Sequence, residues 1–428
     1  MTIDIEQYMK QFFKGTKDVN LSAMKYFMKE YNDFQKEMKF IHIAGTNGKG
    51  SCTEMISNIL VKQGYKVGKF ISPHLIKYNE RISINGKEIS NEYMSKLIEE
   101  LETKFDKYKE IYKRSITFFE LETMMALLYF YRNNVDFAIL ETGLGGLYDC
   151  TNIITDPLIS IITSIGYDHM HILGNTLPEI AYQKAGIIKE NSNTVIIEQS
   201  KEVNKIFEKI CLEKKNKLHS ISKKEIENYH YDNDFQYFDY KELKQIQINL
   251  KGKKQVENAS ICIESIKILN KLGYEISEEN LREGLSTVIH KARMEILSKE
   301  PMLIYDGAHN EPAIQNLKES IDMYYKDFKR LYIISILKRK NYEKILSLLM
   351  EDEDAIFIVT SGNDEEKYIS KEVLYEIALK YRKEKQIIKQ NSLEEAIEFA
   401  KKNQSDWVTF IVGSFYTYST VLNKIKNK

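Results

Sequence analysis

The stretch KFIHIAGTNGKGSCTEMISNIL, residues 39–60, decides the fold of the N-terminal part of the chain. Its first seven residues are a short apolar run that ends in glycine, which is typical of a buried strand. A glycine-rich turn with one lysine follows, and from Gly48 the sequence becomes helical. A strand, a glycine turn and a helix in this order predict a phosphate-binding corner of an α/β sheet.

The glycine turn has the chemistry that a phosphate needs. Glycines let backbone N–H groups approach an anion closely, the helix N-terminus adds a partial positive charge, and Lys49 adds a full one. The standard pattern G-x-x-x-x-G-K-[ST] is not met, because Ile43 stands where its first glycine belongs and Gly50 follows the lysine. The alternative is a tight strand-to-helix turn whose lysine is only solvated.

Short apolar segments recur on the C-terminal side of this corner. They predict strands at residues 66–72, 135–141, 158–165 and 193–199. Helical segments lie between them, and this alternation predicts a mostly parallel sheet with helices on both faces. Residues 5–37 have helical spacing and predict two amphipathic helices; residues 235–253 alternate apolar and polar side chains and predict an antiparallel edge or small β-lobe. A helix is expected over residues 255–269.

A new β-α rhythm begins after Pro301. Strands are predicted at 302–306, 330–336, 355–361 and 408–412, with helices near 311–325, 341–351, 370–382, 393–402 and 414–426. About 130 residues of this kind are enough for a sheet of their own. We therefore predict an α/β fold of two domains: residues 1–295, a P-loop-type mostly parallel sheet with a small β-lobe, and residues 296–428, a Rossmann-like α/β domain.

Composition narrows the classes of function. The 62 Lys and Arg residues balance 62 Asp and Glu residues, so broad electrostatic binding to nucleic acid or to an anionic membrane is not expected. The four cysteines form no C-x-x-C, the first residues do not read as a signal peptide, and no apolar run approaches the ~20 residues that span a bilayer. We expect a cytoplasmic, monomeric protein whose partners are small molecules.

Six further segments accompany the phosphate loop in a fixed order. They are SPHLIKYNERISING (72–86), ITFFELET (116–123), ETGLGGLYDCTN (141–152), SIGYDHMHILGNTLPEIAYQKAGIIK (164–189), DGAHN (306–310) and GSFY (413–416). Together with GTNGKGS they resemble the folylpolyglutamate synthase family of the Mur-ligase superfamily, whose members are often also dihydrofolate synthases. The resemblance covers almost the whole chain.

This resemblance implies an ATP-dependent ligase. The family joins the γ-carboxyl of a folate glutamate, or the carboxyl of dihydropteroate, to the amine of L-glutamate. A carboxylate is a poor electrophile, so ATP first converts it to an acyl phosphate. Such a site gathers several negative charges and needs two magnesium ions, a lysine and backbone donors. The sequence leaves open whether the acceptor is dihydropteroate, a folate or both, and how long the glutamate chain becomes.

The family pattern makes Ser72, Glu141 and His169 the predicted metal ligands. Glu141 comes just after an apolar strand, at the sheet edge where α/β ligand sites form, and Mg²⁺ prefers oxygen ligands. By chemistry alone Glu141 is equally a solvated strand end, and His171 is as available as His169. The alignment with the family selects His169.

Lys184 is predicted to be catalytic and to carry a carbamate. It lies on a predicted helix, and by composition it is one of many surface lysines. The matching lysine of the family is carbamylated. That modification requires a neutral amine, hence a lowered pKa in a desolvated site.

The resemblance also implies that ATP is held by both domains. The predicted nucleotide-binding residues are Asn47, Gly48, Lys49, Gly50, Ser51, Asn258, Arg293 and Asp306. Asn258 matches the family's adenine-side asparagine, Arg293 an arginine that reaches phosphate, and Asp306 the residue that holds the ribose. Lys49 and His309 are predicted catalytic residues, His309 on the glutamate side.

The pterin end of the acceptor is assigned to Thr117, Phe119 and Asp149. Phe119 offers a flat apolar surface for stacking, although a core aromatic at a helix start is an equally good reading of the residue. The chain departs from the family at several positions: Leu147 replaces arginine, Cys150 alanine, Lys254 histidine, His290 tryptophan and Ala292 glycine. These changes lie near the substrate and nucleotide edges and leave the chemical core intact.

Three other classes of protein compete with this interpretation. A cell-wall Mur ligase would use the same phosphate chemistry on another acceptor, but the S-P-H-L and T-F-F-E segments favour folate. A nucleotide-binding protein without catalysis would have no need of Lys49, Glu141 or His169. A Rossmann dehydrogenase would have G-x-G-x-x-G after the first strand, and the glycines here have another spacing.

Overall fold

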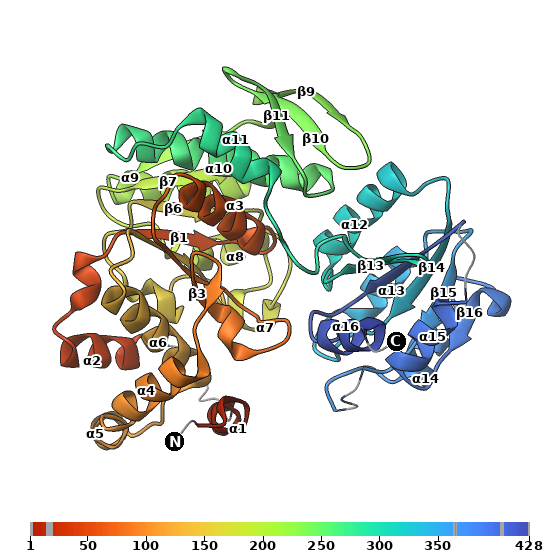
Figure 1. The fold of residues 1–428 in the computed structure, drawn as a ribbon, viewed down its shortest axis with the longest axis horizontal. Coiled ribbons are helices and arrows are strands. Elements are labelled where there is room, and N and C mark those ends of the chain that lie inside the picture. The colour runs from red at the N-terminus through yellow and green to blue at the C-terminus, as the bar shows by residue number, and fades with distance from the viewer. Residues whose placement is uncertain (1–2, 14–19, 363, 365, 403–405, 427–428) are drawn as a thin grey trace. The chain divides into compact units, whose positions relative to one another are not determined.

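The computed structural model describes residues 3–13, 20–362, 364, 366–402 and 406–426. The chain forms two compact units (Figure 1). The first comprises Met1–Tyr231, Phe235–Asn249 and Val256–Val288, and the second comprises Asp232–Asp234, Leu250–Gln255 and Ile289–Lys428. Each unit is described by itself below.

The first unit contains most of the helices and two sheets. Its helices are α1 (Ile5–Lys10), α2 (Ser22–Glu30), α3 (Lys49–Lys62), α4 (Asn91–Glu102), α5 (Phe105–Tyr112), α6 (Phe118–Arg132), α7 (Met170–Leu173), α8 (Leu177–Ala185), α9 (Lys201–Glu213), α10 (Lys253–Lys271) and α11 (Glu278–Ser286), with short 3-10 helices at Gln11–Phe13, Phe34–Glu37, Tyr78–Arg81, Cys150–Ile153 and Lys223–Glu225. Its strands are β1 (Phe40–Ala44), β2 (Val67–Phe70), β3 (Ile82–Ile84), β4 (Lys87–Glu88), β5 (Phe137–Glu141), β6 (Ile159–Ile162), β7 (Asn193–Ile197), β8 (Lys217–Ile221), β9 (Ile226–Tyr231), β10 (Gln236–Tyr240) and β11 (Leu243–Ile248).

The larger sheet has β1 near its centre. Within the described residues its strand order is β4-β3-β2-β5-β1-β6-β7-β8. The strands from β2 to β8 in this order run parallel, and only β3 and β4 are antiparallel additions at one edge. Ligands of such sheets bind beyond the carboxyl ends of the strands, so β1, β5, β2 and β6 bring their following loops to one edge.

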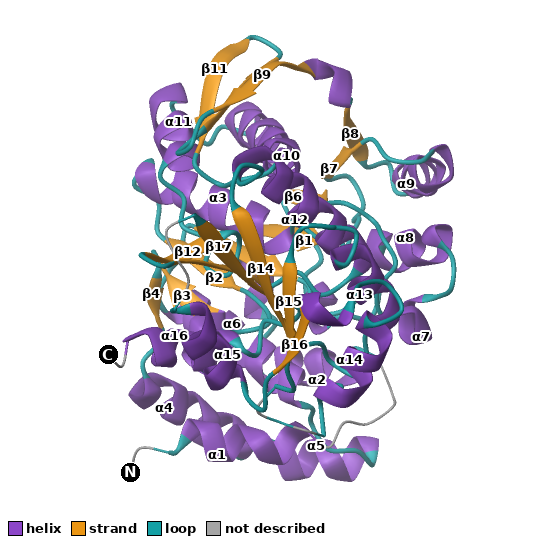
Figure 2. Cartoon of the chain, turned by 90° about the vertical axis from the view of Figure 1, so that its right-hand side faces the viewer, coloured by secondary structure: helices purple, strands orange, loops and turns teal. Residues whose placement is uncertain are grey.

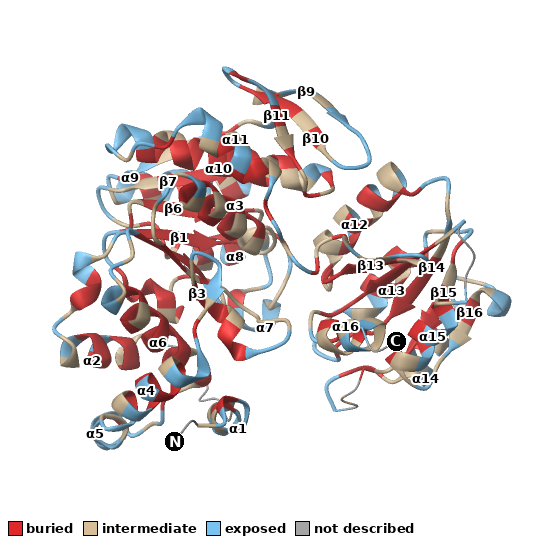
Figure 3. Cartoon of the chain, in the orientation of Figure 1, coloured by how far each residue is buried: buried red, intermediate tan, exposed pale blue. Residues whose placement is uncertain are grey.

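Helices cover both faces of this sheet. Alternate residues of a strand point to opposite faces, so Phe40 and Ala44 of β1 lie on the same side, where Phe40 packs with α6 and Ala44 with α8 and α9. Helices α3, α10 and α11 lie over the other side (Figure 1). Both sides of the strands are therefore buried, as Figure 3 shows, and this explains why the strand sequences are mostly apolar rather than alternating.

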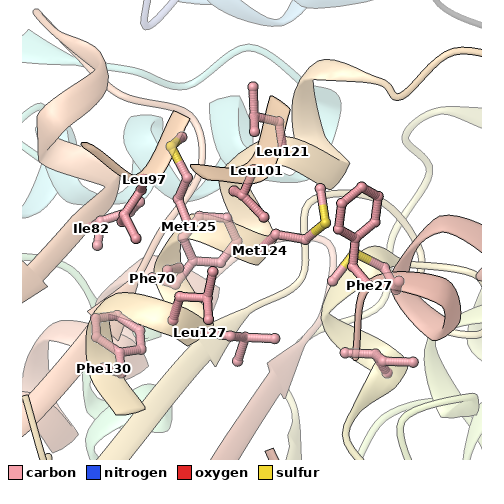
Figure 4. Packing of buried hydrophobic residues seen from close by; sticks show 14 of the residues in the cluster. Phe27, Phe70, Ile82, Leu97, Leu101, Leu121, Met124, Met125, Leu127 and Phe130 are labelled. Carbon is pink, nitrogen blue, oxygen red and sulfur yellow. The ribbon is translucent and has the colours of Figure 1, made fainter. Parts of the chain in front are cut away.

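The core between the sheet and the α2, α4 and α6 helices is aromatic and rich in methionine. Figure 4 shows Phe70 of β2 and Met124, Met125 and Phe130 of α6 packed together, with Phe27 of α2 beside them. Each of these side chains is fully buried. At roughly 1.5–3 kcal/mol for each large apolar side chain removed from water, this cluster anchors the N-terminal helices to the sheet.

The segment from residue 201 to 254 has more structure than its sequence predicted. Its first part forms α9 and then β8, which extends the large sheet in the parallel sense beside β7. The predicted β-lobe is present as a separate three-stranded antiparallel sheet of order β11-β10-β9 (Figure 2). This small sheet contacts α10 through Glu264, whose carboxylate accepts hydrogen bonds from Tyr240 and Lys241 at 3.1 and 2.9 Å.

The second unit contains one sheet of its own. Its elements are β12 (Glu295–Lys299), β13 (Met302–Asp306), α12 (Glu311–Tyr324), β14 (Lys329–Ile334), α13 (Tyr342–Leu349), β15 (Ile356–Val359), α14 (Lys371–Ala378), a 3-10 helix (Glu384–Gln386), β16 (Ile387–Lys389), α15 (Leu393–Ala400), β17 (Trp407–Val412) and α16 (Tyr418–Lys426). The strand order is β12-β13-β17-β14-β15-β16, parallel except for β12. Helices α12, α13 and α14 share one core cluster on one face of the sheet.

The predicted α/β class with two parallel-sheet regions is confirmed. The strands that the sequence did not reveal are β3, β4, β8, β9, β12 and β16, and they lie at or beside a sheet edge. Edge strands are short and only partly buried, so their sequences carry little apolar signal. Among the described residues no helix is both long enough and apolar enough to cross a membrane.

Candidate active site

The loop after β1 is held in shape by close packing. Gly48 has φ 91°, in the left-handed region, and a Cβ there would lie 2.6 Å from Oδ1 of Asn258. The structure thus brings Asn258 of α10 against the loop, although the two are far apart in the sequence. Glycine is needed at position 48 for its backbone conformation and for this contact.

The end of β6 fixes the other side of the loop. The backbone N–H of Thr46 donates to the carbonyl of Ser164 at 2.8 Å, and the Thr163 hydroxyl donates to the carbonyl of Asn47 at 2.7 Å. Gly48 is the N-cap of α3 and offers no side-chain oxygen to the first N–H groups of that helix. A rigid loop that leads into a helix without a side-chain cap is an arrangement that suits an anion.

Two lysines and one carboxylate converge on this loop. Nζ of Lys184 donates to the carbonyl of Gly45 at 2.8 Å, and Nζ of Lys49 donates to the same oxygen at 3.3 Å. Nζ of Lys49 also lies 3.8 Å from the Glu141 carboxylate, which comes from the end of the neighbouring strand β5. The structure therefore gathers Lys49, Glu141 and Lys184 at one corner of the first unit.

Burial changes the chemistry of Lys184. The side chain is 4% exposed, and burial together with the nearby positive charge of Lys49 lowers the pKa of Lys184 to about 7; Asp168 and Asp149 oppose this shift. An amine with this pKa is substantially neutral near pH 7, in contrast to an exposed lysine. The sequence alone could not single out Lys184, because its burial depends on how α8 packs against the loop.

The predicted metal ligands follow three strands that end at the same edge. Ser72 follows β2, Glu141 ends β5 and His169 follows β6. His169 is in the left-handed conformation, φ 50°, and its Nε2 lies 3.8 Å from the Asp168 carboxylate. His171, the other candidate, is exposed.

The donor set at this edge suits magnesium by its chemistry. A carboxylate and a hydroxyl supply the hard oxygen ligands that Mg²⁺ prefers, and Glu141 is buried. Over the residues that the structure describes, no group of three or more His, Cys, Asp or Glu side chains is arranged to hold a metal ion. Magnesium binding by Ser72, Glu141 and His169 stays a prediction.

Phe119, one of the predicted pterin residues, lies beside the glycine turn after β5. A Cβ on Gly143 would be 2.5 Å from the ring of Phe119, so the ring lies directly over this turn. Phe119 is only partly buried and its ring centre is 5.6 Å from that of Phe70. Thr117 is the N-cap of α6 and forms a capping box with Glu120, so its hydroxyl already has a structural partner.

The Asp149 side chain is buried, and its carboxylate makes hydrogen bonds within its own loop. Its carboxylate accepts from the backbone N–H of Leu144 at 2.8 Å and from the hydroxyl of Thr151 at 2.5 Å, and burial raises its pKa. His42 of β1 lies behind it, with Nε2 2.8 Å from the Thr151 oxygen. A D-x-T spacing is typical of a side chain that caps its own turn, and this spacing could have revealed the structural role of Asp149.

The predicted residues of the second unit gather at the carboxyl ends of β13 and β17. Asp306 ends β13 and accepts from the backbone N–H groups of Met294 and Ala308 at 2.9 and 2.8 Å. Burial raises its pKa, and the nearby Arg293 opposes that shift. Ala292, at a position where the resemblance predicts glycine, has φ 57°, so the left-handed backbone is kept without the residue that adopts it most easily.

Phe415 links two other predicted residues of this unit. The Arg293 guanidinium lies 4.6 Å from its ring centre, and the ring of His309 lies 5.2 Å away, edge to face. Nδ1 of His309 is 2.7 Å from the carbonyl of Gly307, and since a carbonyl only accepts, this nitrogen carries the proton. In the neutral ring Nε2 is then the basic nitrogen. Phe415 had no assigned role in the sequence, although it lies in the GSFY segment.

Comparison with known proteins identifies the family of the chain. Residues 43–266 match the Mur ligase middle domain, and residues 290–424 match the dihydrofolate synthetase C-terminal domain. The dihydrofolate synthase/folylpolyglutamate synthase of Bacillus subtilis is 34% identical over 422 residues, which cover 95% of each chain.

Two solved structures have the same fold. The Mycobacterium tuberculosis folylpolyglutamate synthase complexed with ADP has a TM-score of 0.90 and 25% identity, over 99% of this chain and 98% of its own. The E. coli FolC structure in complex with DHPP and ADP has a TM-score of 0.84 and 26% identity, over 98% of this chain and 96% of its own. The β1 corner and the two parallel sheets define the class, a ligase of the Mur type. Within that class, the chain belongs to the dihydrofolate synthase/folylpolyglutamate synthase family.

Proposed function

We propose that this chain uses ATP to add L-glutamate to a folate, and also to dihydropteroate, through an acyl phosphate. The observation that carries the proposal is the convergence of Lys49, Lys184 and Glu141 on the loop after β1. The names of its relatives support the choice of acceptor, and the ADP bound to the M. tuberculosis structure supports the nucleotide.

The proposed reaction has two steps. A carboxylate oxygen of the acceptor attacks the γ-phosphorus of ATP, and ADP leaves. The amine of glutamate then attacks the acyl carbon, the C–O bond to phosphate breaks, and an amide and inorganic phosphate form with loss of one proton from the amine. Lys49 and the backbone N–H groups at the start of α3 stabilise the charge that develops on the transferred phosphoryl group.

Residues of the second unit complete the proposal. Asp306 and Arg293 would bind the ribose and a phosphate of the nucleotide, and His309 would line the glutamate side and take up the proton of the amine through Nε2. Its hydrogen bond to the Gly307 carbonyl orients the ring and fixes the tautomer. Asn258 would contact the adenine side, and Thr117, Phe119 and Asp149 would form the pterin pocket. Residues 1–295 and 296–428 would be the functional domains of a cytoplasmic monomer.

Magnesium and a carbamate would complete the chemistry. Ser72, Glu141 and His169 would hold magnesium, and two ions are expected in all. Bound magnesium would neutralise part of the phosphate charge. The neutral amine of Lys184 would attack carbon dioxide and lose a proton, leaving a carbamate in place of a cation. Its pKa of about 7 and its complete burial support this step.

One assay tests the proposed function. The purified protein is given ATP, magnesium and labelled glutamate with one of three acceptors: dihydropteroate, tetrahydrofolate, or a UDP-muramyl acceptor. We expect label in the first two products and none in the third. Label in the muramyl product alone would establish the cell-wall reaction instead, and ATP-dependent incorporation into none of them would contradict the proposal.

A further inference from the structure

The ring of Phe415 contacts two side chains of the second unit that the proposed function uses. The Arg293 guanidinium lies 4.6 Å from the centre of this ring. The imidazole of His309 meets the same ring edge to face, with the ring centres 5.2 Å apart and the planes at 66°. Arg293 precedes β12 and His309 follows β13, so the two come from separate loops and share this one contact.

Phe415 lies against the backbone of the loop that follows β13. A Cβ on Gly307 would be 2.1 Å from the Phe415 ring, so the ring rests directly on this glycine. The backbone N–H of Gly413 donates to the carbonyl of Ala308 at 3.0 Å, and the N–H of Gly307 donates to the carbonyl of Ala292 at 2.9 Å. The three segments of chain that carry the arginine, the histidine and the phenylalanine are thus joined by their backbones.

Buried hydroxyl groups hold the residue that precedes Phe415. The Tyr305 hydroxyl donates to the carbonyl of Ser414, and the hydroxyl oxygens of Ser414 and Tyr368 lie 3.0 Å apart. The Ser414 hydroxyl also accepts from the backbone N–H of Tyr416 at 3.1 Å. These contacts fix the backbone on both sides of Phe415, and they therefore limit the directions that its half-buried ring can take.

A fixed ring at this place would prepare both neighbours for the reaction. An arginine side chain loses rotamer freedom when it binds a phosphate, and a guanidinium already held by an aromatic ring has less freedom to lose. The imidazole of His309 is oriented by the Gly307 carbonyl and by the edge contact with Phe415. On the basis of the proposed function, we propose that Phe415 is a positioning residue, which acts on ATP through Arg293 and on the glutamate amine through His309.

Substitutions of Phe415 test whether the ring matters. Phe415→Leu removes the ring and keeps an apolar side chain. We expect the KM for ATP to rise about two- to fivefold, the scale of one cation–π contact, and kcat to fall about twofold or more with the loss of the edge contact. Phe415→Tyr keeps the ring and should keep KM and kcat near the values of the parent.

Double variants distinguish positioning from a general structural role. If Phe415 acts through Arg293, Phe415→Leu should raise the KM for ATP in the parent but not in Arg293→Ala. If it acts through His309, the same change should lower kcat in the parent but not the residual kcat of His309→Ala. A structural role would give the same fold-change in all three backgrounds, because independent effects add in free energy.

Trp407→Leu is the matched control. Trp407 begins β17, the strand that leads to Phe415, and its half-buried ring has Nζ of Lys329 at 5.9 Å from its centre. Its loss should change the melting temperature and leave KM and kcat as they are. Melting temperatures report on the fold of every variant, and Phe415→Met, whose flexible side chain fills irregular space, replaces Phe415→Leu if that variant does not fold.

Three results would overturn the proposal: a folded Phe415→Leu with the KM and kcat of the parent, equal fold-changes in all backgrounds, or kinetic changes of the same size in Trp407→Leu. Calorimetric binding of AMPPCP repeats the Arg293 comparison without turnover. A parent that shows this coupling but incorporates no labelled glutamate would contradict the proposed function and support the positioning of Arg293. A parent that incorporates glutamate without the coupling would contradict the positioning alone.

Discussion

Each of the two parallel sheets has a turn that joins a strand to a helix, but the two turns carry different side chains. After β1 the turn GTNGKG carries a lysine, and its N-cap Gly48 has no side chain. After β13 the turn carries an aspartate and a histidine, and Asn310 caps α12 by accepting from the backbone N–H of Ala313 at 3.0 Å. The N-terminus of α3 thus lacks a side-chain cap, whereas the N-terminus of α12 is capped by the Asn310 side chain. The turn residues, rather than the topology, support the proposal that phosphate binds at the first corner.

The largest effect is expected from removing the charge of the first corner. Lys49→Ala should lower glutamate-dependent ATP hydrolysis about 10²–10³-fold, the scale for loss of one preorganised electrostatic contact, or ~2–4 kcal/mol. The melting temperature is the control for folding, because Lys49 also donates to the Gly45 carbonyl and lies 3.8 Å from the buried Glu141 carboxylate. Turnover near that of the parent would show that the β1 corner does not act on phosphate.

Lys184→Ala should reduce activity on the order of 10²-fold, since the same loop loses its buried partner. The proposed carbamate gives a second readout, the ¹³C NMR signal formed with ¹³C-bicarbonate. Only the neutral amine reacts, so the signal should grow as pH rises through about 7, the pKa of Lys184.

A second lysine with a lowered pKa, the half-buried Lys189, supplies the control for that signal. Burial and the charge of Lys214 lower the pKa of Lys189 to about 8. Lys189→Ala should keep the carbamate signal and Lys184→Ala should lose it. The opposite pattern would assign the modification to Lys189, and no signal in the parent would remove the carbamate from the account.

Glu141→Gln keeps the shape of the side chain and removes its charge. We expect the magnesium concentration for half-maximal activity to rise by about tenfold or more, since even loss of an outer-shell partner has that effect. The melting temperature is the control for folding. A magnesium titration that overlays the parent's would mean that Glu141 is not a ligand.

Gly48→Ala tests the contact between the loop and Asn258. Its Cβ would stand 2.6 Å from the Asn258 amide oxygen, so nucleotide affinity should fall several-fold, about 1 kcal/mol. Gly64→Ala is the matched control, because Gly64 also has a positive φ, 97°, but a Cβ at that position would have no other atom within 4 Å. Gly64→Ala should lose only the stability that a positive φ costs an alanine, and Gly48→Ala should also lose what the overlap with Asn258 costs. Equal ADP affinity in the two would contradict a role for this contact.

The smallest effect is expected at the second corner. Asn310→Ala removes the cap of α12 and should lower the free energy of unfolding by about 1 kcal/mol. Activity should fall only slightly, because this helix end is satisfied by its own side chain rather than by a phosphate. A loss of activity as large as that of Lys49→Ala would mean that the two corners are functionally alike.

The sequence predicted the strands that form long apolar runs. It did not predict the short edge strands, whose burial depends on the rest of the fold. The apolar runs revealed β1, β5, β6 and the central strands of the second sheet, because a strand covered on both faces is apolar at most positions. The edge strands β3, β4 and β16 have two or three residues each, and β8 is largely exposed or half-buried. Their sequences have no such run.

The candidate site shows the same limit. Lys49 and Glu141 follow strands directly, so their place at the sheet edge was predictable from the sequence. Lys184 is one of many lysines until α8 packs against Gly45, and only then does its pKa fall. The contact of His42 with Thr151, the residue that donates to Asp149, also depends on the tertiary fold, because it joins a core strand to a loop more than 100 residues away.

Oxygen transfer tests the central claim most directly. A folate whose γ-carboxylate carries ¹⁸O is incubated with the protein, ATP, magnesium and glutamate, and the inorganic phosphate is analysed by mass spectrometry. An acyl phosphate requires one carboxylate oxygen to leave with the phosphate, so the account predicts one ¹⁸O in each phosphate released by the parent, at a rate that falls with ligation in Lys49→Ala. Ligation that proceeds in the parent with unlabelled phosphate would contradict the account.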